Sequence, residues 1–315
     1  MDDYNTSISK ILVSEDKPIL SICIPTFNRA ERLNKCLFSI FNQIGNNMEY
    51  EIIVSDNCSD DNTMEIVSYY TKKFNNILYF KNEFNMGTDK NFILSAKKAN
   101  GKYIFLHGDD DYFKDGSLSM IMCSLKKILD SGIIFIDVRK KDNNVNIVYG
   151  LDNFIHSVSI YSTFASSLIM NGYEFNKIGL VEKMSQSNLS NLYWICSILE
   201  KNSKCTIINS DIYYQEEDNA PGGYTYSFAE VMIKNYFTML EQFVGRGLNK
   251  ETIENEKDNL VGRSLWYFEY GLKRKDEVFI KNFEEIFYEF YSDKEYFNEA
   301  WKALLAIKEE FNTVE

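Results

Sequence analysis

The feature that most constrains the fold is an alternation of short apolar runs with amphipathic segments over the first 140 residues. The intervening segments carry apolar residues at helical spacing, as at Leu33, Leu37, Ile40 and Ile44. Such alternation is typical of parallel strands joined by right-handed helical crossovers, with both faces of the sheet covered. We therefore expect an α/β domain with a mostly parallel sheet flanked by helices. Five apolar runs predict its strands: Ile19–Ile24, Glu51–Val54, Ile77–Phe80, Tyr103–Leu106 and Ile133–Val138.

The pattern changes after Asp137. Gln215–Tyr226 combines acidic residues with proline and glycine, which favours a mobile lid. From Ser227 onwards the sequence is predicted to be helical, and stripes of aromatic residues at helical spacing usually form core or interface. We expect residues 1–226 to form the α/β domain, and residues 227–315 a helical extension that serves as an interface or faces a second substrate. The other elements expected after Asp137 are a hairpin strand at Asn144–Tyr149, a helix at Leu189–Leu199 and strands at Cys205–Ile208 and Ile212–Tyr214.

Charge excludes some functions. The formal net charge of −12 argues against binding nucleic acid, which requires a basic surface. An acidic protein that handles a phosphorylated substrate needs a cation between the two, and a divalent metal is the simplest choice. The six cysteines form no Cys-x-x-Cys pair and only two histidines occur, which argues against zinc. With no apolar run near the ~20 residues of a membrane helix, we expect a cytoplasmic protein, at most peripheral to the inner face of the membrane.

Polar side chains follow four of the predicted strands at the point where each strand ends. Ligands of open parallel sheets bind at this edge, where loops and helix N-termini meet. Asp109, Asp110 and Asp111 follow the fourth strand directly, and adjacent carboxylates repel one another unless cations or hydrogen-bond donors hold them. The alternative, a solvated turn, is common for aspartate pairs elsewhere. The other segments at this edge are Pro25–Arg29, Ser55–Asn57 and Asn85–Asn91.

The chemistry of this edge indicates a divalent cation. Hard oxygen ligands select Mg²⁺ or Mn²⁺, and such sites complete their shell with substrate phosphates and water. The sequence contains neither a Gly-x-Gly-x-x-Gly motif after the first strand nor a Gly-x-x-x-x-Gly-Lys-Ser/Thr loop. A diphosphate would therefore be held through the metal. Asp56 could instead be a helix cap, and Asn85-x-Gly87 could be a plain turn.

Three strings of this sequence resemble family 2 glycosyltransferases. They are Ser21–Arg29, Val54–Asp60 and Asn85-x-Gly87-x-x-x-Asn91. Gly101-Lys102-Tyr103 leading into Gly108-Asp109-Asp110-Asp111 is similar to the form seen in abequosyltransferase-like members. The resemblance covers roughly residues 19–140 and implies a GT-A fold over residues 1–226, a nucleotide-diphosphate sugar as donor, and Mn²⁺ or Mg²⁺ as cofactor.

The resemblance also implies roles for individual residues. Asp56 would read the nucleobase and Phe27 would flank it. Asp110 would bind the metal, with Asp111 beside it. The residues implied in binding the nucleotide or its sugar are Pro25, Phe27, Arg29, Asp56, Asn85, Gly87, Asp89, Lys90, Asp109 and Asp110.

One departure concerns the catalytic base. Many inverting relatives carry a Glu-Asp pair before a helix in the second half, and here that position falls on Asn191-Leu192, which cannot accept a proton. The substitutes are the carboxylates of the second half, each of which could also be an ordinary surface charge: Glu182, Asp211, Glu216, Glu217 and Asp218.

The sequence thus predicts a metal-dependent glycosyltransferase that moves a sugar, from a UDP-sugar by preference, to an acceptor hydroxyl. The acceptor would be a glycan, a glycoprotein or a lipid-linked sugar of bacterial surface-glycan or glycoprotein assembly, and the reaction would invert the anomeric carbon. Two alternatives stay open: a catalytically silent subunit that binds sugar nucleotides or acts as a scaffold, and a nucleotidyltransferase. The C-terminal helices could also pair protomers into a homo-oligomer.

Overall fold

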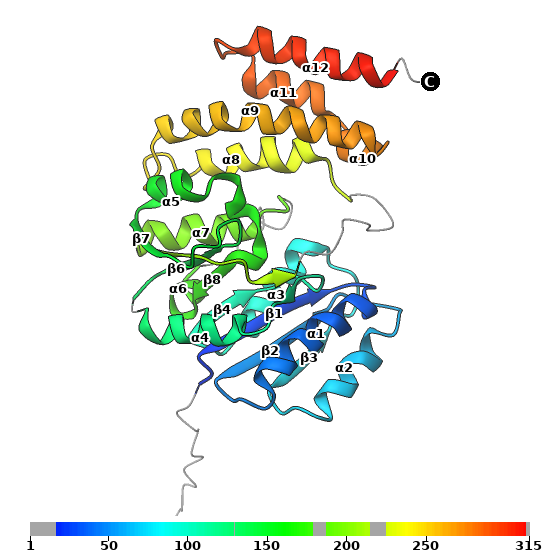
Figure 1. Cartoon of the computed structure of the whole chain (residues 1–315), viewed down its shortest axis with the longest axis vertical. Coiled ribbons are helices and arrows are strands. Elements are labelled where there is room, and N and C mark those ends of the chain that lie inside the picture. The colour runs from blue at the N-terminus through cyan, green and yellow to red at the C-terminus, as the bar shows by residue number, and fades with distance from the viewer. Residues whose placement is uncertain (1–16, 129, 179–186, 215–224, 313–315) are drawn as a thin grey trace, which may run out of the picture.

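The computed structural model describes residues 17–128, 130–178, 187–214 and 225–312. An eight-stranded sheet in the order β3-β2-β1-β4-β8-β6-β9-β7 forms its centre. Helices cover both faces of the sheet, and the C-terminal helices stack beyond one of these faces (Figure 1). The predicted α/β fold with a helical C-terminal region is confirmed.

One half of the sheet is parallel. Its strands pair in the order β3-β2-β1-β4, and the register places Thr26 of β1 beside Asp56 of β2. Their carboxyl ends therefore meet at one edge, as the alternating pattern predicts. Strands β1, β2 and β4 are buried along almost their whole length, whereas β3 is a partly exposed edge strand. The four strands are β1 (Leu20–Thr26), β2 (Tyr50–Asp56), β3 (Ile77–Lys81) and β4 (Tyr103–Leu106).

The other half of the sheet is mixed. β8 (Leu168–Asn171) lies between β4 and β6 (Ile133–Asp137) and runs antiparallel to both. β6 pairs in parallel with β9 (Lys204–Asn209), and β7 (Val145–Tyr149) pairs antiparallel with β9. The prediction of a hairpin strand at Asn144–Tyr149 was therefore wrong about its partner. β9 arrives later in the chain and lies between β6 and β7.

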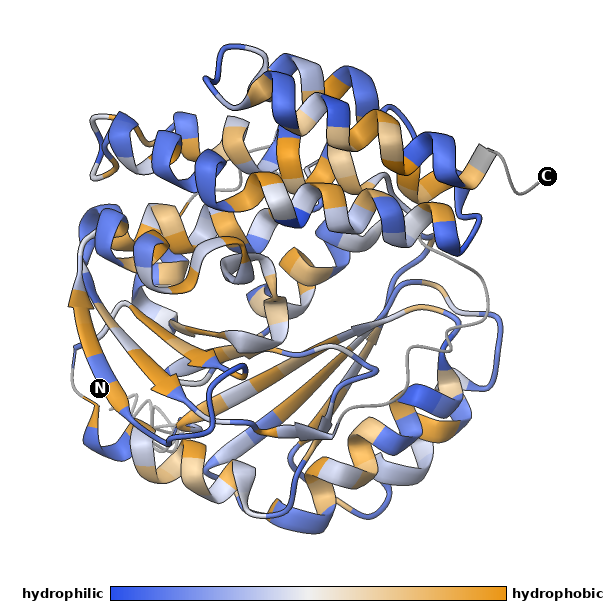
Figure 2. Ribbon diagram, turned by 45° about the horizontal axis from the view of Figure 1, so that its top comes forward, coloured by the Kyte–Doolittle hydropathy of each residue, from blue (hydrophilic) through white to orange (hydrophobic). Residues whose placement is uncertain are grey.

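Two hydrophobic cores fill the two faces of the sheet. Side chains alternate along β1, so Ile22 and Ile24 belong to one core and Cys23 to the other. The strands are accordingly rich in hydrophobic residues, whereas most helices alternate hydrophobic with hydrophilic ones (Figure 2). The helices α1 (Ala30–Ile44), α2 (Thr63–Thr71) and α4 (Ser117–Lys127) pack on the first core. The helices α3 (Thr88–Lys97), α5 (Leu151–Val158) and α7 (Ser190–Lys201) pack on the second.

The C-terminal helices share the second core. Phe228, Tyr236 and Phe237 lie in the same cluster of buried residues as Phe154 of α5 and Trp194 of α7. No helix among the described residues is both long and apolar enough to cross a bilayer. This region consists of a π-helical turn (Ala229–Asn235), α8 (Tyr236–Glu241), α9 (Lys250–Lys273), α10 (Glu277–Ile280), α11 (Phe283–Tyr291) and α12 (Phe297–Asn312). The remaining short elements are β5 (Tyr112–Phe113), β10 (Tyr213–Tyr214), which pairs antiparallel with β5, α6 (Gly172–Asn176) and two 3-10 turns (Ser159–Thr163 and Ala165–Ser167).

A buried carboxylate joins the C-terminal helices to the sheet domain. Glu256 of α9 accepts hydrogen bonds from Ser159 Oγ (2.6 Å) and from Tyr236 Oη (2.9 Å), both at its Oε1 atom. Burial raises the pKa of this carboxyl, although the two hydroxyls and the nearby charges of Arg263 and His156 lower it in part. Burying the ionised carboxylate of Glu256 therefore costs folding free energy, and the two hydrogen bonds offset part of that cost.

We predict that Glu256→Ala lowers the free energy of unfolding by roughly 1–3 kcal/mol, because the buried hydroxyl of Tyr236 and the half-buried hydroxyl of Ser159 lose their acceptor. Glu256→Gln keeps that acceptor and should be much milder. Since the folded state raises the pKa of Glu256, the wild type loses stability as pH rises through that value. The stability of Glu256→Gln relative to the wild type should thus increase as pH rises above the ordinary pKa of a glutamate, about 4.3, which urea titrations from about pH 4 to about pH 7 measure. A relative stability that does not change with pH would contradict this account.

Candidate nucleotide and metal site

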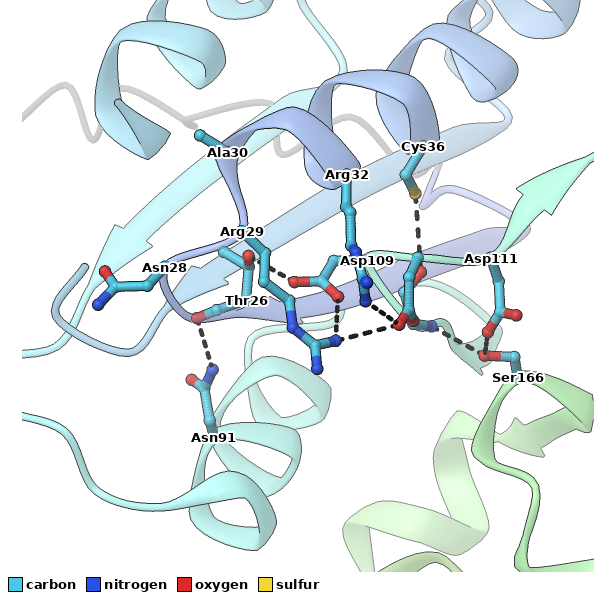
Figure 3. Close-up of polar contacts among 12 residues, drawn as sticks. Thr26, Asn28, Arg29, Ala30, Arg32, Cys36, Asn91, Asp109, Asp111 and Ser166 are labelled. Atoms are coloured by element: carbon cyan, nitrogen blue, oxygen red, sulfur yellow. Dashed lines mark hydrogen bonds and ion pairs between the residues drawn. The ribbon is translucent and has the colours of Figure 1, made fainter. Parts of the chain in front are cut away.

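A cleft of about 430 Å³ opens at the carboxyl ends of β1, β2 and β4. It contains aromatic, amide and carboxylate groups together with one arginine. The loops after β1, β2, β3 and β4, the first turn of α3 and Thr225 build it, so segments far apart in the sequence meet there (Figure 3). It is lined by Pro25, Thr26, Phe27, Arg29, Asn57, Asn85, Gly87, Thr88, Asn91, Phe92, Gly108, Asp109, Asp110 and Thr225.

Asparagine side chains hold the loops of the cleft. Asn57 Nδ2 donates to Asn85 Oδ1 (2.7 Å), and Asn57 Oδ1 accepts from the Met86 backbone N–H (2.9 Å). Asn91 Nδ2 donates to the Ser55 carbonyl (2.8 Å) and reaches the Thr26 carbonyl at 3.4 Å. These amides add side-chain hydrogen bonds to backbone groups at the ends of β1 and β2, and so help to keep the spacing of the two strand ends fixed.

Asp109 is buried at the floor of the cleft. Its carboxylate accepts a hydrogen bond from Thr26 Oγ1 (2.7 Å) and pairs with Arg29 Nη1 (3.1 Å). Burial raises the pKa of Asp109 to about 6, although Arg29 and Thr26 act in the opposite direction. A carboxylate in this position gains from any further cation that enters the cleft.

Asp110 lies at the mouth of the cleft, where its side chain is 40% exposed. Its Oδ2 atom lies 3.1 Å from Arg29 Nη1 and also 3.1 Å from Arg32 Nη1. Both arginines belong to the start of α1, and Figure 3 shows them reaching toward the acidic cluster. Sequence reasoning missed Arg32, although its spacing of three residues from Arg29 places the two on one helix face.

A closed network positions Asp111. Ser166 Oγ donates to Asp111 Oδ2 and accepts from the Gly108 backbone N–H (2.8 Å). His107 is buried with its Nε2 3.1 Å from the Asp111 carbonyl and its Nδ1 3.1 Å from Tyr213 Oη. Burial lowers the pKa of His107 to about 3, so the ring is neutral and its one N–H, on Nε2, donates to the Asp111 carbonyl.

This network ties the acidic cluster to the second half of the chain. Tyr213 Oη also donates to the Ser166 carbonyl (2.7 Å). Neither Ser166 nor Tyr213 carries a motif, so the sequence offered no signal for them. Burial raises the pKa of Asp111 to about 6, with the Ser166 hydroxyl acting against that rise.

Two carboxylates converge over Gly108, and this arrangement fits a hard divalent cation. A Cβ atom on Gly108 would lie 2.7 Å from Asp111 Oδ2 and 3.1 Å from Asp110 Oδ1, so only glycine leaves this space open. Within the described residues, no group of three or more His, Cys, Asp and Glu side chains is arranged to hold a metal. The protein could thus supply two oxygen ligands, and phosphate oxygens and water would supply the rest, which is the usual pattern for Mg²⁺.

Seven of the ten residues predicted to bind the nucleotide or sugar line the cleft, whereas Asp56, Asp89 and Lys90 do not. Asp56 is buried at the end of β2 and accepts hydrogen bonds from Tyr79 Oη (2.6 Å) and from the Ser59 backbone N–H (2.8 Å). Its carboxylate therefore shapes the loop after β2. Thr26 separates it from Asp109, so both acidic groups lie at the same sheet edge.

Asp89 faces away from the cleft, toward α7. Its Oδ2 accepts from the Asn188 backbone N–H (2.7 Å), and its Oδ1 accepts from Ser190 Oγ (3.2 Å). These contacts satisfy donors at the N-terminus of α7, as capping carboxylates do. Lys90 is exposed on the next position of α3.

Of the candidates for the catalytic base, one lies among the described residues and four lie outside them. Asp211 does not line the cleft. It forms ion pairs with Lys114 (2.7 Å) and Lys141 (2.8 Å), which lower its pKa and make it a weaker base. Glu182, Glu216, Glu217 and Asp218 lie outside the described residues, as does most of the predicted lid. Asn191 donates its amide to the carbonyls of Ser162 and Thr163.

The sequence model of the family described as "Glycosyl transferase family 2" matches residues 21–178. The chain belongs to this family, and the resemblance drawn from its motifs is confirmed. Abequosyltransferase RfbV of Salmonella typhimurium is 40% identical over 113 residues, which are 36% of this chain and 34% of the relative. The GalNAc(5)-diNAcBac-PP-undecaprenol beta-1,3-glucosyltransferase of Campylobacter jejuni is 38% identical over 106 residues, which are 33% of this chain and 34% of the relative. These alignments span about a third of the length of either relative.

Two solved structures have a similar fold over nearly the whole chain. S. aureus TarS 1-349 in complex with UDP-GlcNAc superimposes with a TM-score of 0.63 at 16% identity, over 94% of this chain and 92% of that one. Mannosyltransferase PcManGT from Pyrobaculum calidifontis, in complex with GDP-Man and Mn²⁺, gives a TM-score of 0.57 at 12% identity, over 95% and 83%. At these identities the likeness concerns the fold alone.

We predict that Asp89→Ala lowers the free energy of unfolding by about 1–2 kcal/mol, because α7 loses its capping carboxylate. Nucleotide affinity should hardly change, since Asp89 faces α7 and not the cleft. Urea unfolding and calorimetric titration with UDP measure the two effects separately. Unchanged stability together with lost affinity would return Asp89 to the ligand-binding role that the sequence motif implied.

Proposed function

We propose that this chain is a metal-dependent glycosyltransferase that moves a sugar from a nucleotide diphosphate to an acceptor hydroxyl. One observation carries the proposal: Asp109 and Asp110 meet Phe27 and Arg29 in a cleft at the carboxyl ends of β1 and β4. An aromatic face, a guanidinium and a carboxylate pair match the base, the phosphates and the cation of such a donor. Membership of family 2 supports the same reaction class.

The position of each residue in the cleft indicates which part of the donor it would bind. Phe27 stacks on the nucleobase, and the amides of Asn57 and Asn85 face the nucleoside. Asp109 holds Arg29 and Thr26 in place and lies within reach of the ribose or the donor sugar. Asp56 supports the loop after β2 through Tyr79 and Ser59, and so positions the neighbouring Asn57.

Asp110 and Asp111 are the residues that would hold Mn²⁺ or Mg²⁺. A divalent cation in such a site stabilises the negative charge that grows on the leaving diphosphate. Ser166 and His107 keep the Asp111 carboxylate turned toward Gly108 for that purpose. The Mn²⁺ in the PcManGT complex supports a metal at this kind of site.

Transfer would proceed by direct displacement with inversion at the anomeric carbon. A carboxylate removes the proton of the acceptor hydroxyl as that oxygen attacks. Asp211 is held by two lysines, so we assign the base to Glu182, Glu216, Glu217 or Asp218. Thr225 lines the cleft directly after the acidic segment that contains three of these residues, which favours that segment.

The donor we favour is a UDP-sugar. UDP-GlcNAc and UDP occupy the complexes of TarS, which shares this fold. The acceptor would be a bacterial glycan, glycoprotein or lipid-linked sugar, since the relatives named above are an abequosyltransferase and a glucosyltransferase of an undecaprenol-linked glycan. A lipid-linked acceptor would bring the protein to the inner face of the membrane. We assign residues 227–315 to the acceptor side or to contact between protomers. Light scattering would detect association of protomers.

We predict that UDP-sugars, tested beside GDP-, CDP- and dTDP-sugars, raise the melting temperature most, and only with Mn²⁺ or Mg²⁺ present. A ligand at a hundredfold excess over its Kd stabilises the folded state by about 2.7 kcal/mol, a shift that thermal melting detects. If no nucleotide sugar shifts the melting temperature, the proposal fails. Pyrophosphate released from a nucleoside triphosphate would indicate a nucleotidyltransferase, and binding without slow donor hydrolysis or transfer would indicate a silent subunit.

Asp110→Asn should reduce transfer and donor hydrolysis at least ~100-fold while the protein stays folded, because one anionic ligand of the cation is lost. The matched control is Asp115→Asn, an exposed aspartate five residues further along. Initial rates of both variants at saturating Mn²⁺ provide the measurement. Full activity of Asp110→Asn would remove the metal from the proposal.

Ser166→Ala should weaken Mn²⁺-dependent nucleotide binding roughly 10–100-fold, since Ser166 orients a metal-binding carboxylate without touching the metal. Ser157→Ala is a suitable control, because that hydroxyl donates to a carbonyl of its own helix on the surface. Calorimetric titrations with UDP, with and without Mn²⁺, distinguish the two roles. An equal loss under both conditions would mean that Ser166 supports only the fold.

A further inference from the structure

We infer that Arg29 and Arg32 form a diphosphate-binding pair, which Asp110 holds at the mouth of the cleft until a nucleotide arrives. This guanidinium pair would share the charge of the diphosphate with the cation. The sequence had assigned that charge to the cation alone. The inference rests on the proposed function and adds Arg32 to its binding site.

The geometry leaves both guanidinium groups able to bind more. Arg29 Nη1 lies 3.1 Å from Asp109 Oδ1 and 3.1 Å from Asp110 Oδ2, and Arg32 Nη1 lies 3.1 Å from that same Oδ2. In the contacts among the described residues, each arginine uses only its Nη1 nitrogen. A guanidinium carries five N–H donors, and these side chains are 48% and 31% exposed. The remaining donors can reach an anion at the cleft mouth.

Charge balance requires such a pair. Three adjacent carboxylates against two guanidinium groups leave one formal negative charge at the site. A diphosphate adds two more, and a divalent cation returns the total to a single negative charge. Without the arginines, the cation alone would face three carboxylates and the diphosphate. No glycine-rich loop follows β1 to supply backbone donors instead.

The shared Asp110 oxygen links the pair to the metal. Asp110 presents Oδ2 to both arginines and Oδ1 to the space over Gly108. A cation bound by Asp110 and Asp111 would weaken the ion pairs between Asp110 and the two guanidinium groups, because the cation and the guanidinium groups compete for the same negative charge. The freed guanidinium groups then face the phosphates, with which arginine forms bidentate hydrogen bonds.

A purely structural ion pair would behave differently. Partly exposed pairs of this kind stabilise proteins by only about 0–1 kcal/mol, and their loss leaves ligand affinity unchanged. A diphosphate-binding pair and a purely structural ion pair therefore predict different ligand affinities for the variants. Measured stability alone does not distinguish the two hypotheses.

The test compares Arg32→Gln with the wild type in three titrations, with UDP, with uridine and with Mn²⁺ alone. UDP affinity in Mn²⁺ should fall roughly 10–100-fold, as expected for the loss of a charge-assisted contact to phosphate. Affinity for uridine should stay unchanged, because uridine has no phosphate. Mn²⁺ alone, followed by electron paramagnetic resonance, should bind several-fold more tightly, because Arg32 no longer competes for Asp110. Arg32→Lys should recover part of the UDP affinity, since it restores the charge but not the planar fork.

The control is Lys35→Gln, which removes one positive charge from the next turn of α1 and should leave all three affinities unchanged. Equal UDP affinity of Arg32→Gln and the wild type would overturn the inference, as would an equal loss of UDP and uridine. An equal effect of Lys35→Gln would overturn it too, by reducing the role of Arg32 to net charge. Wild-type protein that binds none of UDP, GDP, CDP and dTDP in Mn²⁺ would instead refute the proposed function.

Discussion

The structure of the site depends on one electrostatic constraint: three consecutive carboxylates stand at the end of a buried strand. Asp109 and Asp111 are largely withdrawn from water, and burial raises the pKa of each to about 6. Thr26 and Arg29 lower that cost at Asp109, and Ser166 from a distant turn lowers it at Asp111, while Arg32 pairs with Asp110 beside them. The side chains at this edge of the sheet thus surround a negatively charged cluster that a further cation would stabilise.

The same constraint explains why the second half of the chain is needed for a site whose motifs lie in the first half. Ser166 precedes β8, and β8 lies between β4 and β6, so the antiparallel strand delivers that hydroxyl to Asp111. Tyr213 on β10 completes the network through His107. The support for the acidic cluster therefore comes from residues about 55 and 100 positions further along the chain than the cluster itself.

Sequence patterns predicted well those elements that burial of apolar residues determines. They predicted poorly the strand order, which depends on pairing between segments far apart in the sequence. The runs that became β1, β2 and β4 are apolar because both faces of the sheet are covered. Nothing local marks Leu168–Asn171 as a central strand, or shows that β9 separates β6 from β7. The acidic cluster was predictable from its place after a strand, but the direction of a carboxylate was not. Asp56 and Asp89 lie in the expected loops, yet one faces Tyr79 and the other α7.

Asp89 shows how such a carboxylate still affects the site. It joins the first turn of α3, which borders the cleft at Thr88 and Asn91, to the N-terminus of α7. Asn191 on that first turn of α7 then holds the carbonyls of Ser162 and Thr163, a few residues before Ser166. In relatives that carry an acidic residue at this position, α7 would present a base. Here an amide fixes the backbone there, so the proposed function assigns proton removal to a carboxylate on another segment.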